Sequence, residues 1–155
     1  MIYSLFLLKL FISFQVVLLG FMLFHDWISI PPFNDIEAIR KNHSRLSILF
    51  STLINSLCVA IPLYLTLFYF DSSLLVILCF YSGLTAGAIV SWWAPYFFGS
   101  SIAHKKSFSK FKNTHHFLPV RGDNVIPNSL HVVLHLFILA CFALSLYFYF
   151  NRLSF

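Results

Sequence analysis

The chain of 155 residues is 59% hydrophobic and 19% aromatic, and only 10% of its residues are charged. Soluble domains are about 45–50% apolar and about 25% charged, so this composition excludes an ordinary soluble protein and indicates a membrane protein. The net charge of +5 does not indicate nucleic-acid binding, because the basic residues flank hydrophobic runs instead of forming a soluble basic surface. We therefore expect a single membrane domain over residues 1–155, in contact with the lipid bilayer and not with nucleic acid.

Four hydrophobic runs are long enough to cross a bilayer core of about 30 Å as helices. Lys9 lies within the first run and is expected to extend toward the near interface. A cleaved signal peptide is the alternative for this run, but no small-x-small cleavage site follows it. The expected fold is an all-α, antiparallel bundle of four transmembrane helices. Its spans cover residues 2–24, 46–70, 73–98 and 128–150, and its polar connections cover 25–45 and 99–127.

The first polar connection is expected to contain a short helix at the membrane interface. Pro31-Pro32 stops any preceding helix. Asn34, with Glu37 three residues later, is typical of a helix N-cap and its capping-box partner. An amphipathic helix beginning at Asp35 would turn its isoleucines toward the bundle and its basic residues toward the head groups.

The second and third spans are separated only by Tyr69 to Ser72, so they are expected to form a tight hairpin with Asp71 capping the third helix. Gly83 and Gly87 in the third span have the GxxxG spacing that lets another helix approach closely. Two interpretations remain open for these glycines. They pack inside one bundle, or they form the contact of a homo-oligomer.

Two amides fall near the middle of adjacent spans. An amide in hydrocarbon is costly unless it is hydrogen-bonded, so Gln15 and Asn55 are expected to face inward. Their expected partners are each other, Ser56 or Thr85. We interpret them as groups that hold the bundle together and not as part of a transport path.

The basic residues alternate between the connections. The connection after the first span contains three Lys or Arg residues, the hairpin none, and the connection after the third span five. The positive-inside rule then places both long connections in the cytosol, and the hairpin and both termini outside. This orientation brings all seven histidines to the cytosolic face together with most of the acidic residues. These residues are His25, His43, His104, His115, His116, His131, His135, Asp26, Asp35, Glu37 and Asp123.

The sharpest pattern in this set is His131-x-x-x-His135. Residues four apart share one face of a helix, so both imidazoles can converge on one ligand. A divalent metal such as zinc or iron needs further donors, and the candidates for them are His115, His116, His25, Asp26 and Asp123. The alternative is that the pair makes structural hydrogen bonds within the bundle.

Three further residues are candidates for catalysis. A carboxylate beside an imidazole fixes its tautomer and raises its basicity, which makes His25 and Asp26 an acid/base candidate. Arg121 lies in a segment with turn residues, and a planar guanidinium there would clamp a phosphate or carboxylate. The alternative for Arg121 is an ion pair with Asp123 or Glu37.

Two functions of different classes follow. The first is a site at the cytosolic interface that binds a divalent metal or an anionic head group and acts on a lipid-like substrate. The second is a non-enzymatic assembly or interaction subunit that uses its polar face for docking and Gly83 and Gly87 for a contact with another copy. The sequence does not decide whether the protein is an enzyme.

Overall fold

The computed structural model describes residues 5–153, and every regular element in that range is a helix. Four stretches are long and apolar enough to cross a membrane, as the sequence predicted: Leu5–Phe24, Arg45–Phe68, Phe70–Phe98 and Ser129–Arg152. Residues 2–4 of the predicted first span lie outside the described residues. The elements in chain order are α1 (Leu5–Phe24), α2 (Ile36–Asn42), α3 (Arg45–Phe68), α4 (Phe70–Ala88), the π-helical η1 (Ile89–Trp93), α5 (Ala94–Phe98), α6 (Ile102–Phe108), the 3-10 turn η2 (Ser109–Phe111) and α7 (Ser129–Leu153).

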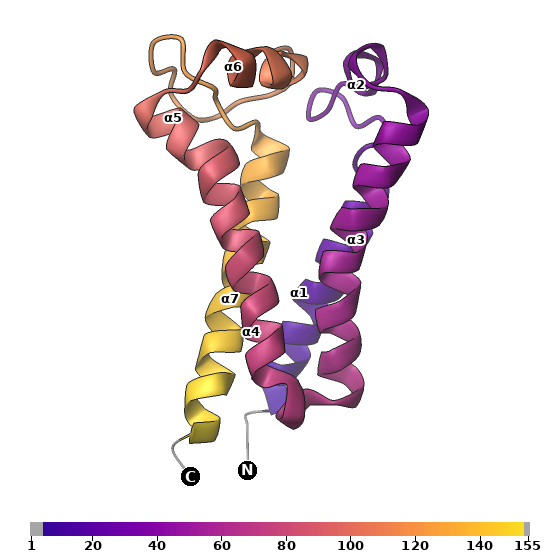
Figure 1. The fold of residues 1–155 in the computed structure, drawn as a ribbon, viewed down its shortest axis with the longest axis vertical. Helices are drawn as coiled ribbons and strands as arrows, with labels where there is room; N and C mark the ends of the chain where they lie inside the picture. The colour runs from indigo at the N-terminus through magenta and orange to yellow at the C-terminus, as the bar shows by residue number, and fades with distance from the viewer. Residues whose placement is uncertain (1–4, 154–155) are drawn as a thin grey trace.

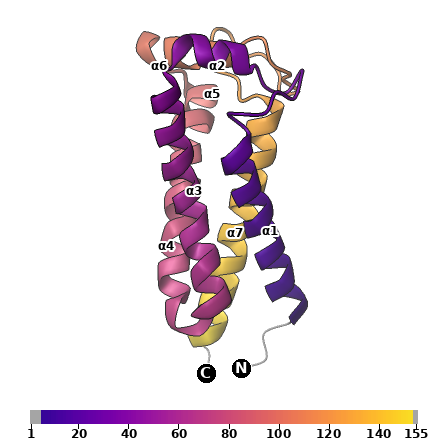
Figure 2. The same cartoon turned by 90° about the vertical axis from the view of Figure 1, so that its right-hand side faces the viewer.

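The long helices form a ring in chain order. α1 packs against α3 and α7, and α4 packs against the same two helices. Both ends of the drawn chain lie at one end of the bundle, and α2 and α6 lie at the other (Figure 1). The view from the side shows the same arrangement, with α2 and α6 crossing above the long helices (Figure 2). We call the end that carries α2 and α6 the capped end.

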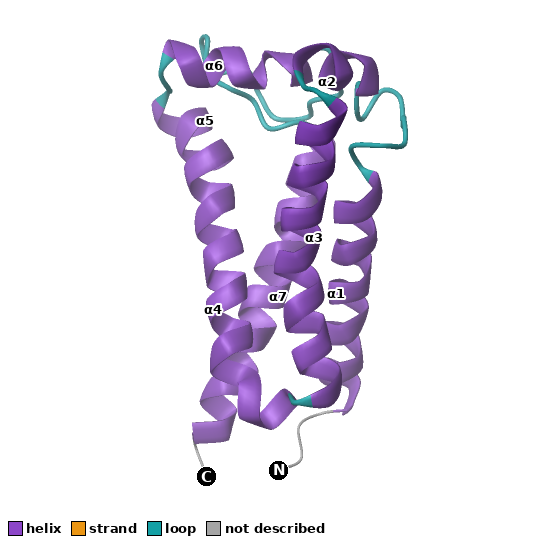
Figure 3. Cartoon of the chain, turned by 45° about the vertical axis from the view of Figure 1, so that its right-hand side comes forward, coloured by secondary structure: helices purple, strands orange, loops and turns teal. Residues whose placement is uncertain are grey.

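The apolar core lies toward the end of the bundle that carries the termini. Phe11 of α1 contacts Tyr81 of α4, with ring centroids 5.9 Å apart, and Phe148 of α7 at 5.7 Å. All three side chains are fully buried. From this core α3 and α4 diverge toward the capped end (Figure 3). Polar residues lie together at the capped end, where α3 and α4 are apart (Figure 3).

The predicted pairing of Gln15 with Asn55 is wrong. Gln15 Nε2 donates to Thr66 Oγ1 at 3.0 Å, and Asn55 Nδ2 lies 3.5 Å from Ser51 Oγ of its own helix. The reason is the helical period. The buried stripe of α3 runs through Thr52, Ser56, Val59, Leu63 and Thr66, and Asn55 lies beside this stripe instead of within it.

Asn34 does not cap α2, contrary to the prediction. Its Oδ1 accepts from the Ile30 N–H at 2.6 Å, and its Nδ2 donates to the carbonyl oxygens of Ile28 at 2.7 Å and His25 at 2.9 Å. The cap is Asp35, whose Oδ1 accepts from the Ala38 N–H at 2.9 Å. A helix N-terminus offers only N–H donors, and the Asp35 carboxylate accepts from one of them. The Asn34 amide both donates and accepts, so it can hold the N–H and carbonyl groups of the preceding turn together.

The hairpin between the second and third spans is shorter than predicted. Tyr69 is the N-cap of α4 and makes no side-chain capping bond, so Asp71 falls inside the first helical turn. A carboxylate there still interacts favourably with the helix dipole. Gly83 and Gly87 are exposed, and a Cβ on either would meet no atom within 4 Å. Their interpretation as packing positions inside the bundle is therefore not supported among the described residues.

Candidate functional site

Six ionisable side chains from four elements lie at the capped end; His43 is exposed, and the other five are half-buried or buried. The ring of His131 lies 6.3 Å from the ring of His25 and 6.2 Å from that of His135. His25 Nε2 lies 3.3 Å from Asp26 Oδ1, and Lys110 Nζ lies 2.9 Å from His43 Nε2. We call these residues the mouth cluster: His25, Asp26, His43, Lys110, His131 and His135.

Asn128 is fully buried and sets the protonation pattern of His131. Thr114 donates its hydroxyl hydrogen to Phe111 O at 2.6 Å, so its Oγ1 accepts from Asn128 Nδ2 at 3.0 Å. The other amide hydrogen of Asn128 goes to Phe33 O at 3.2 Å. Asn128 Oδ1 is then an acceptor, and it lies 2.7 Å from His131 Nδ1. His131 therefore carries its proton on Nδ1, and the neutral ring has its lone pair on Nε2.

Aromatic rings enclose His131. Its ring centroid lies 4.2 Å from that of Trp92 and 4.9 Å from that of Phe111. Trp92 and Trp93 belong to η1, and both lie 6.1 Å from the ring of His135. Tryptophans near the end of a span are typical of an aromatic belt at the membrane surface. Instead, the wide π turn directs two consecutive residues toward α7, and such turns are frequent at functional sites.

The sequence signal for this π turn is Pro95. Proline has no N–H, so in an α-helix the carbonyl oxygen of Ser91 would lose its partner. His104 replaces that partner, because its Nε2 lies 3.1 Å from Ser91 O. The ring of His104 also stacks on Phe108 at 4.3 Å. His104 therefore has a structural role.

The predicted acid/base pair is in direct contact. His25 Nδ1 lies 3.0 Å from Phe21 O, and its Nε2 faces the Asp26 carboxylate. Both ring nitrogens thus face acceptors, and the imidazolium is the form that donates to both. The side chains are 11% and 17% exposed, so the pair is largely shielded from solvent. A shielded carboxylate and imidazole in contact have the geometry that holds or transfers a proton.

Lys110 was not singled out from the sequence, since nothing there separates it from the neighbouring lysines. No carboxylate oxygen of residues 5–153 lies within 4.0 Å of its Nζ. Burial lowers the pKa of the Lys110 ammonium, and the more distant Asp26 carboxylate opposes this shift. Lys110 is therefore a partly buried cation without a contacting counter-ion.

The four predicted metal ligands do not converge. His115 Nδ1 lies 2.7 Å from Ser129 Oγ, and His116 lies with its ring nitrogens 3.3 Å from Pro127 O and 3.0 Å from Phe111 O. The His115 bond ties the second connection to the start of α7, and the two His116 contacts join parts of the second connection to each other. Within the part of the chain that the structure describes, no three His, Cys, Asp or Glu residues are placed to hold a metal ion. A zinc or iron centre stays a prediction from the sequence alone.

Arg121 lies outside the mouth cluster. Its guanidinium carbon lies 5.3 Å from the ring centroid of Tyr96 and 4.9 Å from that of Phe97, a cation–π contact on α5. Asp123, one of its predicted partners, instead accepts a 2.6 Å hydrogen bond from Lys105. That bond holds the pKa of the Asp123 carboxyl below its usual value. The proposed clamping role of Arg121 therefore has no support from contacts with the cluster.

A cavity of about 620 Å³ lies beneath the second connection, with Phe111 and His116 in its wall. Its volume is within the range of about 300–1,000 Å³ that is typical of ligand sites. The Phe111 ring also contacts His131, so it separates this cavity from the mouth cluster.

The mouth cluster combines three chemical capacities. Lys110 supplies a positive charge, His131 Nε2 can accept a proton, and the His25–Asp26 pair can hold one. Such a set is suited to an anionic ligand on which a proton moves. No family model, curated protein or solved structure matches this chain, so its function is argued from these residues.

Proposed function

We propose that the protein is an antiparallel four-helix membrane protein that binds the anionic head group of a lipid-like amphiphile at the mouth cluster. The observation that carries this proposal is Lys110, a partly buried ammonium with no carboxylate in contact. Its Nζ contacts His43 Nε2 at 2.9 Å and lies 5.1 Å from the Phe111 ring centroid, and an anionic ligand adds the contacting negative charge that these neighbours do not supply. Phosphate and carboxylate are the lipid head groups with the required charge.

His131 is the acid/base group of the proposed site. The Asn128 amide holds its ring so that Nε2 faces away from the bond to Asn128 and remains available to a ligand. A neutral imidazole with a fixed tautomer takes a proton from a water or hydroxyl group and returns it to a leaving oxygen. The enzymatic form of the proposal is hydrolysis or transfer at an ester bond next to the head group.

Removing the Lys110 charge should weaken binding of an anionic amphiphile. We expect Lys110→Gln to lower the affinity for hexadecyl phosphate by about ten- to hundredfold, since a charge-assisted hydrogen bond contributes about 1.5–3 kcal/mol. Binding is measured by titrating the ligand into protein in neutral nanodiscs. Lys106→Gln is the matched control, because Lys106 is exposed on α6. Equal affinities of Lys110→Gln and the wild type would overturn the proposed function.

The pH dependence gives the same experiment a second readout. Because burial lowers the pKa of Lys110, its ammonium is lost at a lower pH than that of an ordinary lysine at about 10.4. Affinity should therefore fall with rising pH before that value. Between the lowered pKa of Lys110 in the folded protein and the ordinary lysine pKa in the unfolded chain, the unfolded chain binds more protons. In that pH range the free energy of unfolding therefore rises with pH, while the affinity for the anionic ligand falls. Lys110→Arg should remove the alkaline fall, because arginine stays charged.

The proposed orientation places both long connections and the interfacial α2 in the cytosol, which the distribution of basic residues supports. In a variant without Cys58, Cys79 and Cys141, a cysteine at Asp71 should react with a membrane-impermeant maleimide in intact cells. A cysteine at Lys106 should react only after permeabilisation. External labelling of the second cysteine and not the first would reverse the orientation.

A second candidate function is that of an assembly subunit. The observation that favours it is the exposure of Gly83 and Gly87 on α4, where another helix can approach closely. The two candidates differ in the titration above. A wild-type protein that binds no hexadecyl phosphate would favour the assembly role, with Gly83 and Gly87 as the contact between copies.

A further inference from the structure

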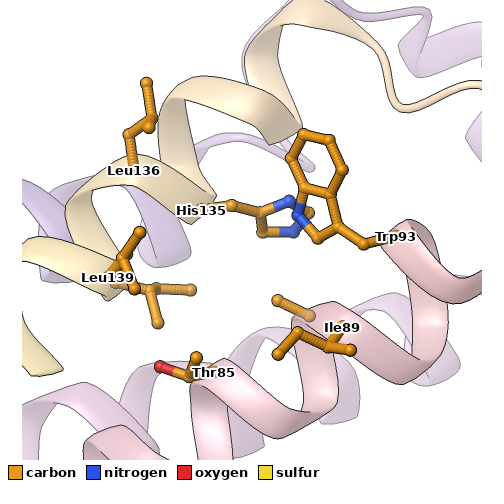
Figure 4. A pocket seen from close by; sticks show the side chains of 8 residues that line it. Thr85, Ile89, Trp93, His135, Leu136 and Leu139 are labelled. Carbon is orange, nitrogen blue, oxygen red and sulfur yellow. The ribbon is translucent and has the colours of Figure 1, made fainter.

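A crevice of about 180 Å³ lies between the α4–η1 rod and α7 (Figure 4). Its wall is apolar except for Thr85, His135 and the indole N–H of Trp93. The Thr85 hydroxyl donates to Tyr81 O of its own helix at 2.8 Å, so it is already satisfied. His135 and the Trp93 N–H are therefore the polar groups in this wall that are left for a ligand.

His135 has the character of an incomplete site. The residue is 8% exposed, and its Nδ1 is buried without a hydrogen-bond partner among the described residues. A buried polar atom without a partner is costly, and native proteins rarely leave one without a ligand or water to bind. Its ring lies 6.2 Å from that of His131, so the crevice adjoins the mouth cluster.

The other end of the crevice faces the surroundings of the bundle. Three side chains of its wall are half exposed: Ile89 at 50%, Leu136 at 60% and Leu139 at 51%. At 1.5 Å per residue, His135 and Leu139 lie about 9 and about 15 Å along α7 from its first residue. In the proposed membrane orientation, that depth is the upper acyl region of the bilayer.

We propose that this crevice holds the single unbranched chain of the amphiphile, with the linking ester between His131 and His135 and the anionic head group at Lys110. The ligand class is then single-chain anionic amphiphiles, such as lysophospholipids and alkyl phosphates. This inference rests on the proposed function. The crevice volume of about 180 Å³ is below the range of about 300–1,000 Å³ that is typical of ligand pockets, so we assign it one chain instead of two.

The test fills the crevice without touching the head-group site. Ala88 lines the crevice, whereas Ala86 is exposed and does not. We expect Ala88→Phe to lower the affinity for hexadecyl phosphate by about tenfold or more and to leave that for butyl phosphate within about twofold, because only the long chain is displaced. The matched control, Ala86→Phe, should bind both ligands as the wild type does.

A photolabel on the wild-type protein gives a readout that does not depend on the variant's folding. Hexadecyl phosphate with a diazirine in mid-chain should label residues 136–139 of α7, in competition with the unlabelled ligand. The crevice inference is overturned if both phosphates bind but Ala88→Phe has the same affinity for hexadecyl phosphate as Ala86→Phe. It is also overturned if the label appears only on α3. In both cases the head-group site stands. If the wild type binds neither phosphate, the proposed function fails first.

Discussion

Replacing Asn128 with alanine should lower the free energy of unfolding by about 2–4 kcal/mol, measured by thermal or denaturant unfolding in a mild detergent. Asn128 is fully buried and joins three parts of the capped end. Its amide donates to Phe33 O of the first connection and Thr114 Oγ1 of the second, and its carbonyl oxygen accepts from His131. Each buried group left without its partner costs about 1–3 kcal/mol.

Two variants separate the hydrogen bonds that the Asn128 amide makes to the two connections from its effect on His131. Asn151→Ala is the control for losing an amide, because the Asn151 side chain bonds only to Tyr147 O of its own helix among the described residues; its effect should stay within about 0.5 kcal/mol. Asn128→Asp keeps an acceptor for His131 Nδ1 and loses both donated bonds. It should be destabilised yet keep the His131 tautomer. Wild-type stability of Asn128→Ala would show that the three segments are held by other contacts.

His131→Phe should lower turnover of a single-chain acyl glycerophosphate by about 10²- to 10⁴-fold, the usual contribution of a general acid/base group. Phenylalanine keeps the ring contacts with Trp92 and Phe111 and removes Nε2. Fatty-acid release measures turnover, and titration with hexadecyl phosphate measures binding, which should change by only a few-fold. The expected pattern is therefore a loss of kcat with little change in ligand affinity.

The matched control is His104→Phe, since His104 bonds to Ser91 O and is not part of the mouth cluster. Its turnover should remain within a few-fold of the wild type. Nitrogen NMR of labelled histidine should find the His131 proton on Nδ1. Full turnover by His131→Phe would show that His131 takes no part in the reaction. If the wild-type protein binds the amphiphile but releases no fatty acid, the protein binds its ligand without cleaving it, and the acid/base role of His131 is contradicted.

The spans were predictable because their signal is carried by many residues at once. Residues 46–70 were predicted for the second span, and α3 covers Arg45–Phe68. The first connection was predicted to carry a helix from Asp35, and α2 begins at Ile36. Hydropathy summed over about 20 residues tolerates an error at any one position. Helix ends were less certain, because a single cap decides them, as Asn34 and Asp35 illustrate.

Side-chain partners were the part that the sequence could not supply. The expected partners of Gln15 were Asn55, Ser56 or Thr85, but it bonds to Thr66, because the choice depends on which stripe of α3 faces α1. Lys110 resembles its neighbouring lysines in the sequence, and the structure distinguishes it by its burial and by its contact with His43. A hydrogen bond depends on distances of a few tenths of an ångström between segments far apart in the chain, and residue spacing does not contain that information.

The amino-acid sequence by itself determined that this is an all-helical chain with four segments fit to cross a membrane, since composition and hydropathy act locally and additively. It also located the histidines near the ends of those segments. Only the tertiary structure decided which of them meet: His25, His131 and His135 come together, while His115 bonds to Ser129 of α7 and His116 bonds within the second connection. The physical reason is that a hydrogen-bond partner on the backbone or on another side chain orients an imidazole ring. The packing of the four helices decides which partner lies within hydrogen-bond distance.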